Sequence, residues 1–269
     1  MYRQPKLSDR ETLKRLWDVE DIKALMSRRT YLLHDHRRKE ELDTLWVREP
    51  EHRRTASLGS NWGFYTGMDS IERFYVTDYQ HALEDRLATI RSAHPDLGLT
   101  DRDTDVGVSC FRCVNTPYVV VADDGRTARG RWYMTGEDTR CSPDGNGEGT
   151  WWCWVIGADF ALEGNGWKLW HLVEAQDLYC PVGQAFRDEP DYHAPGDDPG
   201  ERVFGTPDIA FLAHDNRYLL NDNWPPIPMS YVSFSEETSY GPEGHPGLNR
   251  NIESLEWATE VASKRAWGR

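Results

Sequence analysis

Three side chains near the end of one helical stretch have chemistry suited to proton transfer. Tyr31 and Asp35 are four positions apart, so on a helix a phenol and a carboxylate share one face. In apolar surroundings such a carboxylate could accept a proton or hold a histidine in one tautomer. His34 lies beside it. We therefore take Asp35, Tyr31 and His34 as catalytic candidates; the alternative is a helix-terminal Asp35 paired with Arg37 or Arg131.

A further candidate lies in the segment WKLWHLVE, which reads as a strand. Period-two alternation places His171 and Glu174 on opposite faces of that strand. If the face that carries His171 is internal, His171 is the expected general acid–base. If the face that carries Glu174 is internal, Glu174 takes that role. A histidine among so many aromatic rings could also be a packed core residue.

No motif for a metal or a cofactor is visible. His34 and His36 are two positions apart, which points their rings apart on a helix, and no third ligand motif accompanies them. The phosphate-binding, dinucleotide-binding and nucleophile-elbow patterns are missing. The pair Cys110 and Cys113 lacks the second pair of a zinc ribbon, so the cysteines are expected to be ordinary thiols. We therefore expect chemistry without metal, nucleotide or flavin.

Composition excludes several kinds of partner. The 269 residues carry a formal net charge of −14, which opposes binding to phosphate backbones, so no nucleic-acid partner is expected. No apolar run approaches the roughly 20 residues of a membrane span, and the N-terminus lacks a signal-peptide core. A cytoplasmic protein without a membrane partner is the expectation. Hydrophobic residues at 38% suffice for a sizeable core.

The elements that must position these residues follow an α+β plan, with helices first. Ser8 and Glu11 fit a capping box at the start of a helix, whose apolar spacing changes phase near residues 18–21 and predicts a kink or a second helix there. Further helices are expected up to about Glu49 and from Gly67 to just before Pro95. Strands are expected at about 107–121, 127–136, 150–162 and 167–180, with turns at Asp123-Asp124-Gly125 and Gly164-Asn165-Gly166.

This order, together with DGRTARG, GWKLWHL and the acidic helix end, resembles the SnoaL-like branch of the nuclear transport factor 2-like superfamily over about residues 15–185. Relatives there include scytalone dehydratases, polyketide cyclases and diarylpropane lyases. The resemblance implies an α+β cone, in which a curved antiparallel sheet wraps around N-terminal helices, and cofactor-free proton chemistry on small hydrophobic molecules. Members place an acidic residue where Asp35 lies, and some place a Tyr just before it, where this chain has His34.

The resemblance also suggests which residues contact substrate. Where dehydratases of the superfamily carry histidines on earlier strands, this chain has none, and Arg or Tyr could hold a phenolate or oxyanion there instead. Tryptophans on the strands would form apolar walls, and the segment SNWGFYTG matches a loop that often touches ligand. The substrate-binding residues expected on this basis are Tyr65, Arg112, Asn115, Arg131, Trp132, Trp154 and Glu174.

Beyond Arg187 the chain is rich in proline but still carries many aromatic residues. We expect residues 1–186 to form the cone domain and 187–269 to form an ordered extension, ending in a helix at about 251–266, that packs on the cone or on a partner subunit. A homodimer or higher homo-oligomer through the outer face of the sheet is expected.

The expected function is that of a cofactor-independent lyase, of the dehydratase or formaldehyde-releasing type. It would act by acid–base proton transfer on a small aromatic substrate, for example a lignin-derived one. An isomerase, a cyclase or an epoxide hydrolase could use the same site. A non-catalytic module that binds small molecules is the alternative from another class.

Overall fold

The structure, a computed structural model, describes residues 7–60, 63–141, 147–164, 166–183, 207–210 and 225–245. The helical elements of the first half are α1 (Asp9–His34), α2 (Arg38–Leu45), α3 (Pro50–Thr55), α4 (Met68–Glu72), the π-helix η1 (Arg73–Asp78), α5 (Tyr79–Ala93) and the short 3-10 helix η2 (Pro95–Leu97). The strands are β1 (Ser57–Ser60), β2 (Gly63–Thr66), β3 (Val108–Val121), β4 (Thr127–Cys141), β5 (Gly147–Glu163), β6 (Gly166–Pro181) and β7 (Ile209–Ala210). Two further 3-10 helices follow, η4 (Glu236–Thr238) and η5 (Pro242–Gly244).

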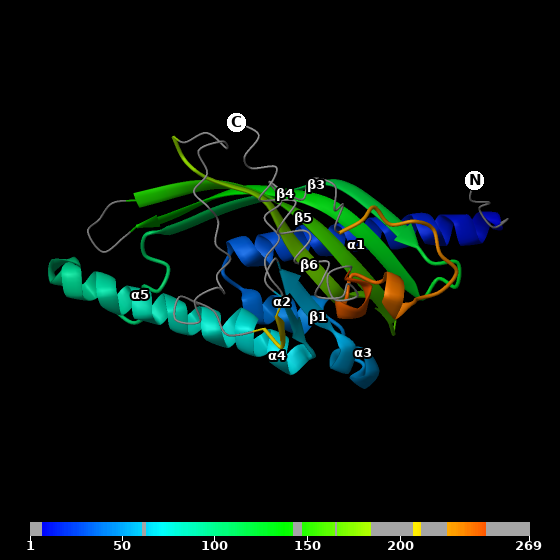
Figure 1. The fold of residues 1–269 in the computed structure, drawn as a ribbon, viewed down its shortest axis with the longest axis horizontal. Helices are drawn as coiled ribbons and strands as arrows, with labels where there is room; N and C mark the ends of the chain where they lie inside the picture. The colour runs from blue at the N-terminus through cyan, green and yellow to red at the C-terminus, as the bar shows by residue number, and fades with distance from the viewer. Residues whose placement is uncertain are drawn as a thin grey trace, which may run out of the picture.

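One sheet with the strand order β3-β4-β5-β6-β1-β2-β7 organises the molecule. Its four long strands are antiparallel neighbours, whereas β1 pairs with β6 in parallel, with Ser57 opposite His171. In Figure 1 the long strands arch over α1 and α2, with the N-terminal helices on the inner side of the curve. This arrangement confirms the expected α+β cone. None of the described helices is long and apolar enough to cross a membrane.

The four long strands lie where alternation and turn residues predict them. Gly125 and Gly164, in the turns between β3 and β4 and between β5 and β6, have φ values of 68° and 56°. Glycine adopts this left-handed conformation without steric penalty. The short β1 and β2 were not predicted, because four residues each give too little alternation to recognise.

Helix α1 begins at the predicted capping box, in which the Ser8 hydroxyl accepts the Glu11 N–H and a Glu11 carboxylate oxygen accepts the Ser8 N–H at 2.7 Å. A second helix starting near residues 18–21, one of the two predicted alternatives, does not form, because α1 runs unbroken to His34. Asp18 explains the apparent change of phase. Its buried carboxylate accepts a hydrogen bond at 3.0 Å from the Trp167 indole N–H on β6. Asp18 thus takes a position that faces the sheet, where the apolar spacing leads one to expect a hydrophobic residue.

The helical region after Gly67 differs from the single helix expected there. It consists of α4, the six-residue π-helix η1 and α5 in direct succession. A π-helical segment is rare, and such insertions are often found at functional sites. Tyr75 on η1 is 3% exposed and reaches buried charged groups. The helix expected to end near Glu49 stops earlier, at Leu45, and α3 follows it separately.

The sheet has a helix-facing side and an outer side. Trp132, Ile156 and Leu172 lie in one apolar core with Ile22 and Met26 of α1, which identifies the helix-facing side. The register shifts where Asp159 pairs with His171 and Phe160 with Leu169, so Trp170 is an extra residue in β6.

This bulge settles which residues of β6 face the helices. Leu169 and Leu172 both join the core, although strict alternation would separate them. Glu174, opposite Ile156, therefore faces the helices. His171, opposite Asp159, lies on the outer side.

The segment 225–245 lies against the outer side of the sheet. A Cβ atom added to Gly157 on β5 would lie 2.5 Å from Pro225 and 2.8 Å from Tyr240, so the strand needs glycine there for the segment to approach. The Tyr240 N–H donates to Asp159 at 2.6 Å. The predicted helix at 251–266 lies outside the described residues.

Candidate functional site

A group of buried charges occupies the space between the helices and the inner side of the sheet. Arg29 of α1 donates from Nε to Glu41 Oε1 at 3.0 Å and from Nη2 to Glu174 Oε1 at 2.7 Å. The Tyr75 hydroxyl donates to Glu41 Oε2 at 2.7 Å, and the Trp46 indole N–H donates to Glu41 Oε1 at 3.1 Å. This group therefore joins α1, α2, η1 and β6, together with Trp46, the residue after α2.

Burial and neighbouring charges together shift the pKa values of Arg29 and Tyr75. Burial works against the charge of Arg29, but Glu174 and Glu41 outweigh it, so the pKa of Arg29 is raised well above its usual value. Burial and the nearby Glu41 charge raise the pKa of Tyr75, which keeps its hydroxyl protonated as a donor. Glu41 is fully buried, and its two oxygens accept the three hydrogen bonds. Glu41 therefore ties α2 to α1 and η1.

Glu174 differs from Glu41 in having an oxygen to spare. Its Oε1 atom accepts from Arg29, whereas Oε2 makes no hydrogen bond with any residue that the structure describes. The side chain is 15% exposed, compared with 0% for Glu41. One oxygen is thus fixed by Arg29 while the other is available to a reacting molecule.

Four buried hydrogen-bond donors in the interior of the cone have no partner among the described residues. We call them the donor cluster, and they are Arg29 Nη1, Arg112 Nε, Trp152 Nε1 and Trp154 Nε1. The Arg112 guanidinium lies 5.8 Å from the Trp152 ring centroid, and the Trp152 and Trp154 rings are 5.2 Å apart. Unpaired buried polar atoms are uncommon in folded proteins and call for an explanation.

The charge of Arg112 is maintained despite its surroundings. Burial acts against it, but Cys110, Asp138 and Glu174 outweigh burial and raise the pKa of Arg112. Burial also raises the pKa of the Cys110 thiol, to about 11. Cys110 is therefore a neutral thiol near pH 7 and not an activated nucleophile.

The helix-facing side carries five of the residues proposed from the sequence. Arg112, Trp132, Trp154 and Glu174 project from β3, β4, β5 and β6 toward the helices, as their register with core residues requires. Tyr65 of β2 is 1% exposed and stacks on Phe74 with ring centroids 3.8 Å apart. The sheet thus brings Arg112, Trp154 and Glu174 into one region.

Three of the proposed catalytic residues lie at the exposed end of α1. Tyr31 is 72% exposed, and His34 and Asp35 are exposed as well. His34 Nδ1 lies 2.8 Å from the Cys110 carbonyl oxygen, which fastens the helix end to β3. Asp35 is the C-cap residue of α1, and its side chain makes no hydrogen bond or ion pair with a described residue.

The remaining three proposed residues face the outer side. Asn115 donates to Thr135 at 3.3 Å, and the Arg131 guanidinium lies 5.4 Å from the centroid of the Tyr133 ring. His171 is 1% exposed. The sheet therefore separates these residues from Glu174.

Both ring nitrogens of His171 face acceptors. Nδ1 is 3.0 Å from Asp159 Oδ2, and Nε2 is 3.1 Å from the Thr55 carbonyl oxygen. Asp159 also accepts from Arg129 Nε at 3.0 Å. This outer group joins β4, β5 and β6 to the segment 225–245.

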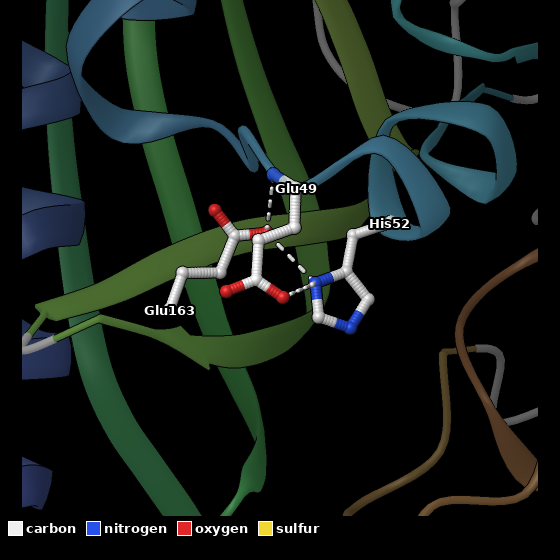
Figure 2. A group of neighbouring side chains, drawn as sticks. All are labelled: Glu49, His52 and Glu163. Atoms are coloured by element: carbon white, nitrogen blue, oxygen red, sulfur yellow. Dashed lines mark hydrogen bonds and ion pairs between the residues drawn. The ribbon is translucent and has the colours of Figure 1, made fainter.

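A group with possible metal ligands lies at the start of α3. Figure 2 shows Glu49, His52 and Glu163 turned toward one another, with their ligand atoms within 4.8 Å. Glu163 Oε2 accepts the Arg48 N–H at 2.6 Å, while Oε1 accepts the Glu49 N–H at 3.1 Å and lies 2.7 Å from His52 Nδ1. Both carboxylate oxygens thus hold the chain just before α3 by accepting the N–H groups of Arg48 and Glu49. We assign this group a structural role.

Sequence patterns alone did not identify Arg29, Glu41 and Tyr75. Arg29 falls at helical spacing within the apolar series Ile22, Leu25, Met26, Leu32 and Leu33. A charge at a core position of an amphipathic helix must find a buried partner, so this spacing was a usable signal. The partners could not be identified, because they come from α2, η1 and β6.

Comparison with known proteins identifies relatives of the fold. A family model described as a SnoaL-like domain matches residues 14–173. An NTF2-like protein with a cystatin-like fold from Novosphingobium aromaticivorans is similar at 18% identity, covering 69% of this chain and 97% of its own, with a TM-score of 0.38.

Two further solved structures are similar to this chain at low identity. The hexachlorocyclohexane dehydrochlorinase LinA-type3 from Novosphingobium barchaimii is 11% identical, with coverages of 68% of this chain and 100% of its own and a TM-score of 0.40. The β subunit of benzoate 1,2-dioxygenase from Burkholderia mallei is 15% identical, with coverages of 59% and 90% and a TM-score of 0.37. No curated protein matches the sequence.

Proposed function

The chain belongs to the SnoaL-like domain family, and from this premise we propose that it is a cofactor-independent enzyme that moves a proton on a small aromatic substrate, as a lyase or an isomerase. The observation that carries the proposal is Glu174. Its Oε1 is held by Arg29 at 2.7 Å, and its Oε2 is left without a partner among the described residues. Many enzymes of this superfamily work without a cofactor.

The proposed reaction begins with proton transfer to Glu174. Oε2 takes the proton from a substrate carbon next to a carbonyl group, and the electron pair of the broken C–H bond forms an enolate. In a lyase, a leaving group on the adjacent carbon then departs with its bonding electrons, leaving a double bond. In an isomerase, the proton returns at another carbon. Arg29 holds the base in a fixed position, which lowers the cost of reaching the reactive geometry.

Aromatic rings around Glu174 favour an aromatic substrate. Trp154 is in the register position opposite residue 176, two residues along β6 from Glu174, and is only partly buried. Trp152 extends the same ring-lined side of the sheet, and Tyr65 stacks on Phe74 in the same core. Sites for small molecules are lined mainly by such rings with a few polar groups.

Proton exchange into a deuterated solvent tests the proposal without a known substrate. Purified protein, treated with chelator, is incubated in D₂O with a panel of aryl ketones and β-hydroxy aryl ketones, and deuteration and elimination are followed by NMR. We expect exchange or elimination above the buffer rate and proportional to protein concentration. A panel without any reaction, or reaction only after adding a metal or nucleotide, would contradict the proposal.

A further inference from the structure

We propose that the donor cluster binds an acceptor oxygen of the aromatic ligand, so that this protein selects aryl carbonyl and aryl carboxylate compounds over hydrocarbons of the same shape. This inference rests on the proposed function for the location of the substrate beside Glu174. It adds the group of the substrate that is recognised and the residues that recognise it.

The backbone brings the donor cluster together. Arg112 on β3, Gly136 on β4 and Trp152 on β5 lie opposite one another in adjacent strands. A Cβ atom on Gly136 would lie 2.3 Å from the Trp152 ring and 2.2 Å from the Phe111 carbonyl oxygen. Glycine in the middle strand therefore leaves the Trp152 ring room to lie over β4 beside Arg112.

The chemistry of the unpaired atoms determines what they bind. An indole N–H and a guanidinium N–H donate hydrogen bonds and accept none. Trp152 is 3% exposed and Arg29 is 1% exposed, so solvent reaches neither side chain freely. A buried donor without a partner destabilises the protein, and a ligand oxygen that accepts its hydrogen bond would remove much of that cost.

The balance of donors and acceptors points to an oxygen-bearing ligand. Among the described residues of β3 to β6, Asp138 Oδ1 is the single buried acceptor without a partner, against three donors of the donor cluster, while Arg29 on α1 supplies the fourth donor. Glu174 Oε2 is also an acceptor, but it is the proposed base and its side chain is not fully buried. An aromatic ligand with an acceptor oxygen can pack its ring against the tryptophans and accept hydrogen bonds from the donor cluster. A hydrocarbon of the same shape leaves those donors unpaired.

Matched probes and matched variants test the inference by binding alone. Acetophenone and ethylbenzene have nearly the same shape, but only acetophenone has an acceptor oxygen, and benzoate tests an anionic acceptor. Dissociation constants are measured by ligand-observed NMR for the native protein and for Trp152→Phe, Trp154→Phe and Trp132→Phe. Phenylalanine keeps an aromatic ring but removes the N–H. Trp132, on the same side of the sheet and outside the donor cluster, is the control.

The native protein should bind acetophenone at least about tenfold more tightly than ethylbenzene, the scale of one or two hydrogen bonds. This preference should fall to about threefold or less in Trp152→Phe or Trp154→Phe and persist in Trp132→Phe. Equal binding of the two probes by the native protein, or an unchanged preference in both cluster variants, would overturn the inference. Because no turnover is measured, failure here is distinct from failure of the deuterium exchange test.

Discussion

Glu174 Oε1 and Arg29 Nη2 lie 2.7 Å apart, although 145 positions separate the two residues in the chain. This ion pair connects the last long strand to the first helix across the interior of the cone. It also divides the two glutamates that surround Arg29 into different roles. Both oxygens of Glu41 accept hydrogen bonds, whereas Oε2 of Glu174 has no partner among the described residues.

Removal of the Arg29 charge should destabilise the fold strongly. Arg29→Met leaves the buried Glu41 and the nearly buried Glu174 without their cation, and breaking such a network costs about 3–5 kcal/mol. Denaturant unfolding followed by circular dichroism measures the change. Arg28→Met is the matched control, because Arg28 is 57% exposed and its contact with Glu40 spans 3.8 Å. Equal, small effects of both changes would contradict a central role for Arg29.

His171 should contribute to stability and not to proton transfer. His171→Gln can keep a hydrogen bond to Asp159 or to the Thr55 carbonyl but not both, so we expect a loss of about 1–3 kcal/mol in the free energy of unfolding. The exchange rate per folded molecule should stay within about threefold of the native rate. Lost exchange with unchanged melting would instead return His171 to a catalytic role.

Removal of the chain after Gly183 should expose the charged side chains of Asp159 and Arg129, which the segment 225–245 covers on the outer side of the sheet. Asp159 would lose the Tyr240 N–H, and Arg129 would lose the Ser235 carbonyl at 3.1 Å together with the Tyr231 ring at 4.5 Å. Aggregation or a clear drop in melting temperature is expected, measured by light scattering and calorimetry. A truncated protein that is monodisperse and melts like the full chain would show that the cover is dispensable.

Asp208 gives the attachment of β7 a defined pH dependence. Partial burial acts to raise the pKa of Asp208, but hydrogen bonds from Ser70 and Thr66 and the charge of Arg73 outweigh it and lower that pKa. A lowered pKa means that the stabilisation is present above the ordinary aspartate value of about 4 and is lost as the pH falls through the lower folded value.

Asp208→Asn should therefore reduce the free energy of unfolding by about 1 kcal/mol or less near pH 7. The difference from the native protein should close below about pH 4. Melting temperatures of both proteins across this range provide the measurement. A difference that persists unchanged at pH 3 would show that charge is not the cause.

The sequence predicted most of the fold because the long strands carry their own signals. Alternation and the turns at Gly125 and Gly164 mark β3 to β6, and the capping box at Ser8 marks the start of α1. The site was harder to predict, because its charges come from distant elements. Alternation separated His171 from Glu174 correctly but could not tell which faced the helices. The bulge at Trp170 and the register of β6 decide that.

The choice between Asp35 and Glu174 as the candidate base also depends on tertiary packing that the sequence does not reveal. Family resemblance pointed to Asp35, whose side chain is exposed at the end of α1. In the sequence alone, Glu174 is a candidate base only as the alternative to His171. Tertiary packing around Arg29 makes Glu174 the better candidate base, and no local pattern near residue 174 contains that information.

Deuterium exchange by two isosteric variants, Glu174→Gln and Asp35→Asn, tests the central claim most directly. Each change removes a proton acceptor and keeps the shape of the side chain, and thermal melting confirms that each variant is folded. We expect Glu174→Gln to lower the exchange rate by about 10² or more, the usual scale for a positioned acid–base group, and Asp35→Asn to stay within about twofold of the native rate. Native exchange in Glu174→Gln with a large loss in Asp35→Asn would contradict the account and place the base at the end of α1.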